Sequence, residues 1–134
     1  MGIKSNIMAF SKTESRIQQE CAVLYRNTFC LAHHKPRCLI FSVPNELKPQ
    51  FTQTGLLAGT SDLVVIHVCV GSVRVIFAEI KAEGKQSPAQ VRFQERIRVL
   101  GETIRHAGIA GLAVEYHLVR SLGEFQRIFE ATAK

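Results

Sequence analysis

Residues 62–81, DLVVIHVCVGSVRVIFAEIK, form two apolar runs that carry charged residues at their outer ends. Residues 63–70 and 73–82 are rich in β-branched side chains, which predicts two strands. Gly71-Ser72 between them predicts a two-residue hairpin turn. Both runs are apolar on both strand faces, so we expect a sheet that is covered on both sides.

The charged residues at the ends of this hairpin come together in either of two registers. A turn at Gly71-Ser72 sets Asp62 opposite Lys81, and a slip of the turn by one residue sets Asp62 opposite Glu79. In both cases the Cβ atoms lie roughly 5–8 Å apart. Glu79 and Lys81 are two positions apart in a strand, so their side chains share one face.

This group of charges has two interpretations. Acids at the ends of core strands cost stability unless they are paired or bind something. Two carboxylates can hold Mg²⁺, which lowers the pKa of bound water and stabilises charge on a phosphate. The alternative is a buried salt bridge from Lys81 to Glu79 or Asp62 without chemistry, although such pairs stabilise proteins weakly.

The hairpin lies within a chain of alternating helices and strands. The patterns predict a helix over 13–27, a short strand over 38–43, irregular structure over 46–60, a helix over 88–107, a strand over 112–119 and a last helix from Ser121. Ser87-Pro88 is a typical helix start. The expected inward residues of the long helix are Val91 or Phe93, then Ile97, Leu100 and Ile104. Those of the last helix are Leu122, Phe125, Ile128 and Phe129.

Size and charge limit the class of protein. The 134 residues fit a single domain, 1–134, with its core over about 13–130. The formal net charge is +6, which suggests an anionic partner such as nucleic acid. No signal peptide or membrane-spanning run is evident, so we expect a cytoplasmic protein.

The cysteines do not form a clear metal motif. Cys21, Cys30, Cys38 and Cys69 include no Cys-x-x-Cys pair, and reduced thiols are expected. Cys30, His33, His34 and Cys38 match no common zinc spacing, so a loop with incidental histidines is the favoured interpretation.

Asp62 followed by Glu79-x-Lys81 on a hairpin after an N-terminal helix resembles the PD-(D/E)XK nuclease superfamily, and more narrowly the VRR-NUC family. The similarity runs from about Thr13 to Phe129. The segments that carry it are Glu14 to Gln18, Ser42 to Asn45, Thr54-Gly55, Gly59 to Leu63, Phe77 to Lys81, Gly84 to Gln90, Val119 to Ser121 and Glu124-Phe125. One departure is Ser61, where the family often has a proline.

The resemblance implies a restriction-endonuclease-like α/β core, in which helices flank a central mixed sheet with a catalytic hairpin. It implies a Mg²⁺- or Mn²⁺-dependent endodeoxyribonuclease. The metal-binding residues would be Glu14, Asp62, Glu79 and Ile80. The catalytic residues would be Asp62, Glu79, Lys81, Glu14 and Gln90, with Lys81 serving the attacking water.

The acid on the first helix has two candidates. The family's glutamate maps onto Glu14 through its spacing to Gln18, and Glu20 is the competitor. The two lie about 240° apart on a helix, so both cannot face one site. Glu14 shares the stripe of Ile17 and is favoured, with a helix-start carboxylate or a capping partner as its structural alternatives.

Further residues are candidates for contact with DNA. Asn45, Ser87 and Lys85 are the expected substrate-binding residues, and Lys35, Arg37, Lys48, Arg92 and Arg96 could contact phosphates. A solvated helix face is the alternative for Arg92 and Arg96, and Asn45 could instead merely end the strand before it. Small stand-alone members of this family tend to be homodimers that cut branched DNA such as Holliday junctions. A flap or nicking nuclease, and a DNA-binding domain with a decayed site, remain alternatives.

Overall fold

The structure is a computed structural model that describes residues 2–30, 38–43 and 59–130, with side chains from residue 13 onward. The described helices are α1 (Gly2–Tyr25), α2 (Pro88–His106) and α3 (Leu122–Glu130), and a π-helical turn (Arg26–Cys30) follows α1. The strands are β1 (Leu39–Ser42), β2 (Leu63–Cys69), β3 (Ser72–Ile80) and β4 (Leu112–Val119). This element order confirms the predicted one.

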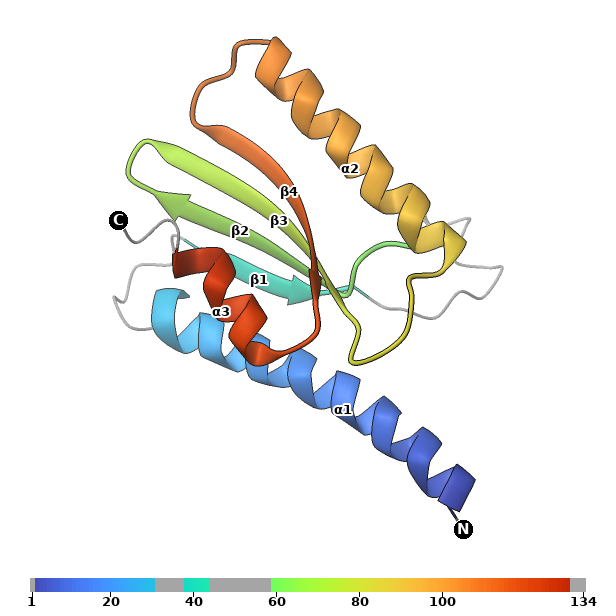
Figure 1. The fold of residues 1–134 in the computed structure, drawn as a ribbon. Coiled ribbons are helices and arrows are strands. Elements are labelled where there is room, and N and C mark those ends of the chain that lie inside the picture. The colour runs from blue at the N-terminus through green and yellow to red at the C-terminus, as the bar shows by residue number, and fades with distance from the viewer. Residues whose placement is uncertain (1, 31–37, 44–58, 131–134) are drawn as a thin grey trace.

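The strands form one mixed sheet in the order β1-β2-β3-β4. The first three strands are antiparallel, and β4 runs parallel to β3. Helices α1 and α3 lie together on one side of the sheet, and α2 lies on the other (Figure 1). The protein is therefore an α+β fold that agrees with the general α/β class expected from the sequence. None of the described helices is both long and apolar enough to cross a membrane.

The main hydrophobic core lies between the sheet and the α1/α3 pair. Alternate residues of β3, Ile76, Ala78 and Ile80, point into it and are at most 3% exposed. Tyr25 of α1 and Phe125 of α3 meet them there. Burial of this apolar surface is the main stabilising contribution to the fold.

The opposite face of the sheet is only partly covered. Helix α2 buries Phe93 and Ile97 against it, with Phe93 edge-on to Phe77 of β3. Leu39 and Phe41 of β1 remain 51% and 42% exposed. Among the described residues, α2 packs against β3 and β4 rather than β1. The expectation that the hairpin strands are covered on both sides agrees with their burial, since most residues of β2 and β3 are buried or half-buried.

The hairpin adopts the second of the two registers considered. Cys69 pairs with Ser72 and Leu63 with Ala78, so the turn consists of Val70 and Gly71. The first register, with Asp62 opposite Lys81, is wrong. Its physical cause is the turn glycine: Gly71 has φ of 76° and takes the second turn position, where a positive φ is needed.

Two other details differ from the sequence predictions. Helix α1 begins at Gly2 rather than near Thr13. In α2, Leu100 is 45% exposed and does not belong to the buried stripe, whereas of the alternatives Val91 and Phe93 it is Phe93 that is buried. Most of the segment expected to be irregular, residues 46–60, lies outside the described residues.

Gly59 fixes the start of α2 against the chain that leads into β2. Its φ is 81°, and a Cβ there would lie 2.2 Å from the carbonyl oxygen of Ala89. The backbone of residue 59 therefore touches the first turn of α2 directly, three residues before Asp62. Only glycine satisfies both the positive φ and this close approach.

We expect Gly59→Ala to destabilise the protein by more than about 2 kcal/mol, because it adds a clash with backbone to the cost of a left-handed residue. Gly84→Ala is the matched control. Gly84 has φ of 85° but open space around it, so only the conformational cost of about 1–2 kcal/mol applies. Urea denaturation of the two variants measures the difference, and equal destabilisation would contradict the tight contact.

Candidate active site

Asp62 and Glu79 form a buried carboxylate pair at the end of the β2–β3 hairpin. The observed register, continued by one residue beyond Leu63 and Ala78, sets the two side by side. Asp62 is 5% exposed and Glu79 is 1% exposed. The Asp62 carboxylate Oδ2 accepts the backbone N–H of Ile80 at 2.7 Å, which fixes the acid to the partner strand.

The surroundings of Glu79 disfavour its charge. Burial raises the pKa of Glu79 well above its ordinary value of 4.5, and the negative charge of Asp62 raises it further. Lys81 opposes these effects, while Glu14 adds to them. The Oε1 atom of Glu79 is buried without a hydrogen-bond partner among the described residues. Such an orphaned acceptor is costly and marks a position where a cation would fit.

Gln90 holds the other oxygen of Glu79. Its Nε2 donates to Glu79 Oε2 at 2.8 Å. Its Oε1 accepts the N–H of Ser87 at 2.7 Å, and its own N–H donates to the Ser87 hydroxyl. Gln90 therefore completes a capping box at the start of α2 and orients Glu79 with the same side chain.

Glu14 reaches the site from α1, and Glu20 does not. Glu14 Oε2 accepts the backbone N–H of Ala82 at 3.2 Å, just past the end of β3. Glu20 instead pairs with Arg16 at 3.7 Å and is 45% exposed. The structure thus brings Glu14, rather than Glu20, toward the hairpin acids.

Lys81 is held by its backbone at the edge of the site. Its N–H donates to the carbonyl of Val119 at 2.9 Å, which extends the β3–β4 ladder by one residue. The guanidinium of Arg120 donates to the carbonyls of Gly84 at 2.9 Å and Lys81 at 3.4 Å. Arg120 therefore braces the turn that carries Lys81.

The sequence did not single out Arg120, Tyr116 or Gln86, although all three stand around the site. The Tyr116 hydroxyl accepts from Gln86 Nε2 at 2.8 Å. Burial raises the pKa of Tyr116 to about 12, and the charge of Glu79 adds to this effect. These residues belong to β4 and its flanks, or contact β4. They could not be predicted because no signal in the sequence indicates that β4 runs parallel to β3 and beside it.

The acids suit a hard cation, although they do not form a closed cage. No three carboxylate, imidazole or thiol groups of the described residues are grouped tightly enough to hold a metal by themselves. Mg²⁺ needs only one or two carboxylates, because water and phosphate oxygens fill its other positions. Asp62 and the orphaned oxygen of Glu79 meet that requirement. Ile80 could contribute only its backbone carbonyl.

The remaining predicted residues take different places. Ser87 uses its hydroxyl as the N-cap of α2, and Lys85 is exposed in the loop after β3. Arg92 and Arg96 are exposed on α2. Asn45, Lys35, Arg37, Lys48, His33 and His34 lie outside the described residues. Cys30 Sγ donates to the carbonyl of Cys38 at 3.1 Å, and all four cysteines are free.

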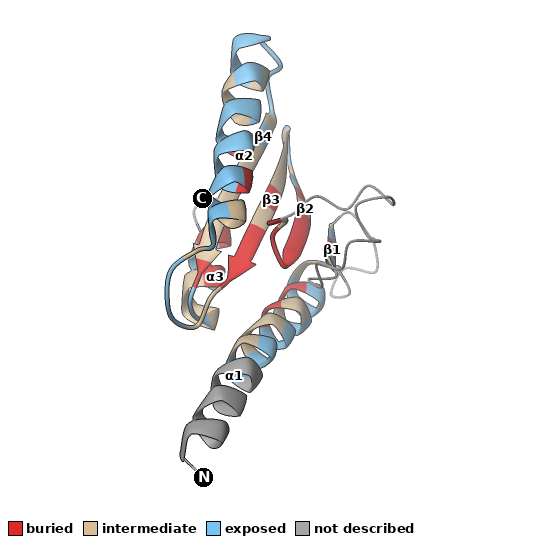
Figure 2. Ribbon diagram, turned by 90° about the vertical axis from the view of Figure 1, so that its right-hand side faces the viewer, coloured by how far each residue is buried: buried red, intermediate tan, exposed pale blue. Residues whose placement is uncertain are grey.

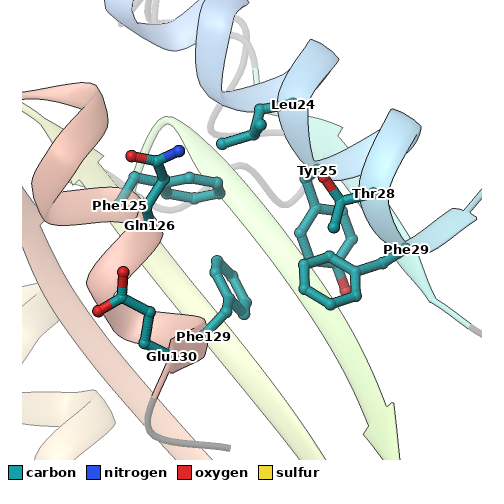
Figure 3. Close-up of a pocket in the computed structure, with 8 residues that line it drawn as sticks. All are labelled: Leu24, Tyr25, Thr28, Phe29, Phe125, Gln126, Phe129 and Glu130. Carbon is teal, nitrogen blue, oxygen red and sulfur yellow. The ribbon is translucent and has the colours of Figure 1, made fainter. Parts of the chain in front are cut away.

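A separate hollow of about 250 Å³ lies between α1 and α3 (Figure 3). Its walls are mainly aromatic, with Phe29, Phe125 and Phe129 around Tyr25. The Tyr25 hydroxyl is turned away to His67 Nδ1 at 2.9 Å. Because no acid–base pair among the described residues lines this hollow, the carboxylate pair is the better candidate for chemistry.

Comparison with known proteins adds nothing to these observations: no protein-family model, no curated protein and no solved structure matches the chain significantly.

We expect Glu79→Gln to remove a pH dependence of stability. The folded state keeps a proton on Glu79 that the unfolded chain releases above about pH 4.5, so the free energy of unfolding falls as pH rises from there through neutrality. The slope from this group reaches at most about 1.4 kcal/mol per pH unit. The uncharged variant lacks it and gains stability over wild type as pH rises.

Urea denaturation at pH 5 and pH 8 in EDTA measures this difference. Glu83→Gln, at an exposed position in the next loop, is the control and should follow wild type. Parallel pH dependence of wild type and Glu79→Gln would contradict a buried, proton-retaining Glu79.

Proposed function

We propose that this chain is a metal-dependent endodeoxyribonuclease of the VRR-NUC type, with a restriction-endonuclease-like core. The observation that supports this most is the buried Asp62–Glu79 pair with an unpartnered carboxylate oxygen and a lysine beside it. Glu14 and Gln90 approach the same hairpin from two different helices. The five residues that the family resemblance implies as catalytic are thus neighbours in space.

Each residue would have a distinct task. Asp62 and Glu79 would hold a Mg²⁺ or Mn²⁺ ion, which supplies charge neutralisation at the phosphate and a more acidic bound water. Gln90 keeps Glu79 in one orientation, and the N–H of Ile80 does the same for Asp62. Lys81 would orient the attacking water or take its proton. Glu14 adds negative charge that favours a cation.

The overall charge supports a DNA substrate. The chain has 17 Lys and Arg residues against 11 Asp and Glu. Lys85 is exposed in the loop between Lys81 and α2, and Arg92 follows on the helix. Contacts of this kind supply most sequence-independent affinity for DNA. We further propose branched DNA as the substrate, a homodimer as the active form, and the cytoplasm as its location, where thiols stay reduced.

Metal binding is testable without cleavage. We expect Mg²⁺ or Ca²⁺ to raise the melting temperature of wild type and EDTA to reverse the change, because a cation that binds both carboxylates, in place of the proton on Glu79, stabilises the folded state over the unfolded chain. At ten times the dissociation constant the gain is about 1.4 kcal/mol. Differential scanning fluorimetry measures it. Asp62→Asn should abolish the response, and an unchanged response in that variant would place the ion elsewhere.

Cleavage tests the chemistry and the choice of helix acid. We expect Asp62→Asn and Lys81→Ala to lose activity at least about a hundredfold, with the fold intact by circular dichroism. Glu14→Gln should lose activity, and Glu20→Gln is the matched control on the same helix. The substrates are a four-way junction, a flap, a nicked duplex and a linear duplex with Mg²⁺ or Mn²⁺. Wild type that cuts none of them would refute catalysis.

A further inference from the structure

The outward face of α2 carries charges of alternating sign. Glu95, Arg98, Glu102 and Arg105 follow one another at spacings of three and four residues, so they form one row along the helix. We call this row the α2 outer face. Glu95, Arg98 and Arg105 are exposed and Glu102 is half-buried, and most of the helix is coloured as exposed in Figure 2. An apolar residue lies near each end: Val91, 50% exposed, and Ile109, 51% exposed.

Among the described residues of one copy, these charges make only local ion pairs. Arg98 contacts Glu95 at 2.6 Å and Glu102 at 2.8 Å. The side chains are 54%, 60% and 46% exposed, respectively. Exposed pairs at this spacing contribute a few tenths of a kcal/mol to the stability of a helix. Breaking them to form ion pairs with another molecule therefore costs little.

The α2 outer face borders a groove of about 590 Å³ along β4. Val91 and Arg98 line one wall of the groove, and Val114 and Tyr116 of β4 line the other. Among the described residues, no strand pairs with the outer edge of β4. An open edge strand beside a charged, partly apolar helix face is a common place for another chain to dock.

We propose that the α2 outer face and this groove bind a second copy of the same chain, with the two α2 helices antiparallel. The row is self-complementary about its midpoint. Glu95 of one copy then lies opposite Arg105 of the other, and Arg98 lies opposite Glu102. Val91 of each copy lies beside the mouth of the groove. Each of these contacts occurs twice, as a two-fold axis requires.

The charge pattern favours a second copy over DNA as the occupant. A phosphate backbone would be repelled by Glu95 and Glu102, and a DNA-binding face would be uniformly basic. The basic residues Arg92 and Arg96 lie on another side of the helix. Arg92 precedes Arg98 by six positions, which places it about 120° around the helix axis from the row.

This arrangement fixes the distance between the two candidate sites. Gln90 lies at the start of α2, and in the antiparallel pair its counterpart lies near the opposite end of the helix. The separation along the axis is about 30 Å, from about 20 residues at a rise of 1.5 Å. If the proposed nuclease function holds, which this consequence assumes, each dimer presents two cutting sites at that separation. The docking itself does not depend on the function.

The test reverses either the two acidic or the two basic residues of the row. The double variants Glu95→Arg/Glu102→Arg and Arg98→Glu/Arg105→Glu each make the row single-signed, so each should be monomeric by sedimentation velocity, with the dimer dissociation constant raised about a hundredfold or more. An equimolar mixture should recover the dimer, because the two rows are then complementary. The control Arg92→Glu/Arg96→Glu reverses the same number of charges on another side of α2 and should remain dimeric.

Circular dichroism and melting temperature check that every variant folds. A monomeric wild type at micromolar concentration would overturn the proposal, and so would dimers in both single-signed variants or a mixture that stays monomeric. The outcome is independent of cleavage: a dimer that cuts no DNA contradicts only the proposed function. A wild type that cuts DNA as a monomer contradicts the docking and the homodimer proposed as the active form, but it leaves the proposed nuclease chemistry standing.

Discussion

The candidate site depends on one constraint, the pairing of β2 with β3 that sets Asp62 beside Glu79. Their closeness is unfavourable in the absence of a cation, since burial and mutual repulsion both disfavour charge on Glu79. The backbone nevertheless leaves no alternative, because seven consecutive residue pairs fix this register. The hairpin therefore holds an arrangement that the two side chains would not adopt by themselves. Such a conflict is typical of functional sites rather than of structural ion pairs.

Much of the fold could be predicted from the sequence, because its elements have strong local signals. The serine and proline at 87–88 gave the start of α2, and apolar alternation gave β4 with its observed bounds. The hairpin register could not be chosen, since both candidates keep every side chain on the same face of the sheet. The long N-terminal part of α1 was missed. Ile3, Ile7 and Phe10 do continue the spacing of Ile17 in the sequence, and that signal could have revealed it.

The acids of the site could be predicted, whereas their supports could not. Asp62, Glu79 and Lys81 stand on one hairpin, where sequence distance fixes spatial distance to within a few ångströms. Tyr116 and Arg120 reach the site only because β4 lies parallel to β3, and a parallel neighbour leaves no mark in the local pattern. The prediction that Leu100 is buried was wrong. The next residue, Gly101, faces the sheet in its place, since a Cβ there would lie 3.0 Å from the carbonyl oxygen of Val114, and a glycine gives no signal in an apolar pattern.

The pleat of β3 separates stability from function. Ile76, Ala78 and Ile80 point to the α1/α3 core, while Phe77 and Glu79 point to the side of α2. The thick core can therefore hold the hairpin whatever the charge state of the acids. Helix α2 is attached more lightly, as it buries only Phe93 and Ile97, yet it carries Gln90, the partner of Glu79. A second copy seated on the α2 outer face would restrain this helix, and through Gln90 it would restrain Glu79. Dimer formation and the precision of the carboxylate pair would then be coupled through a single helix.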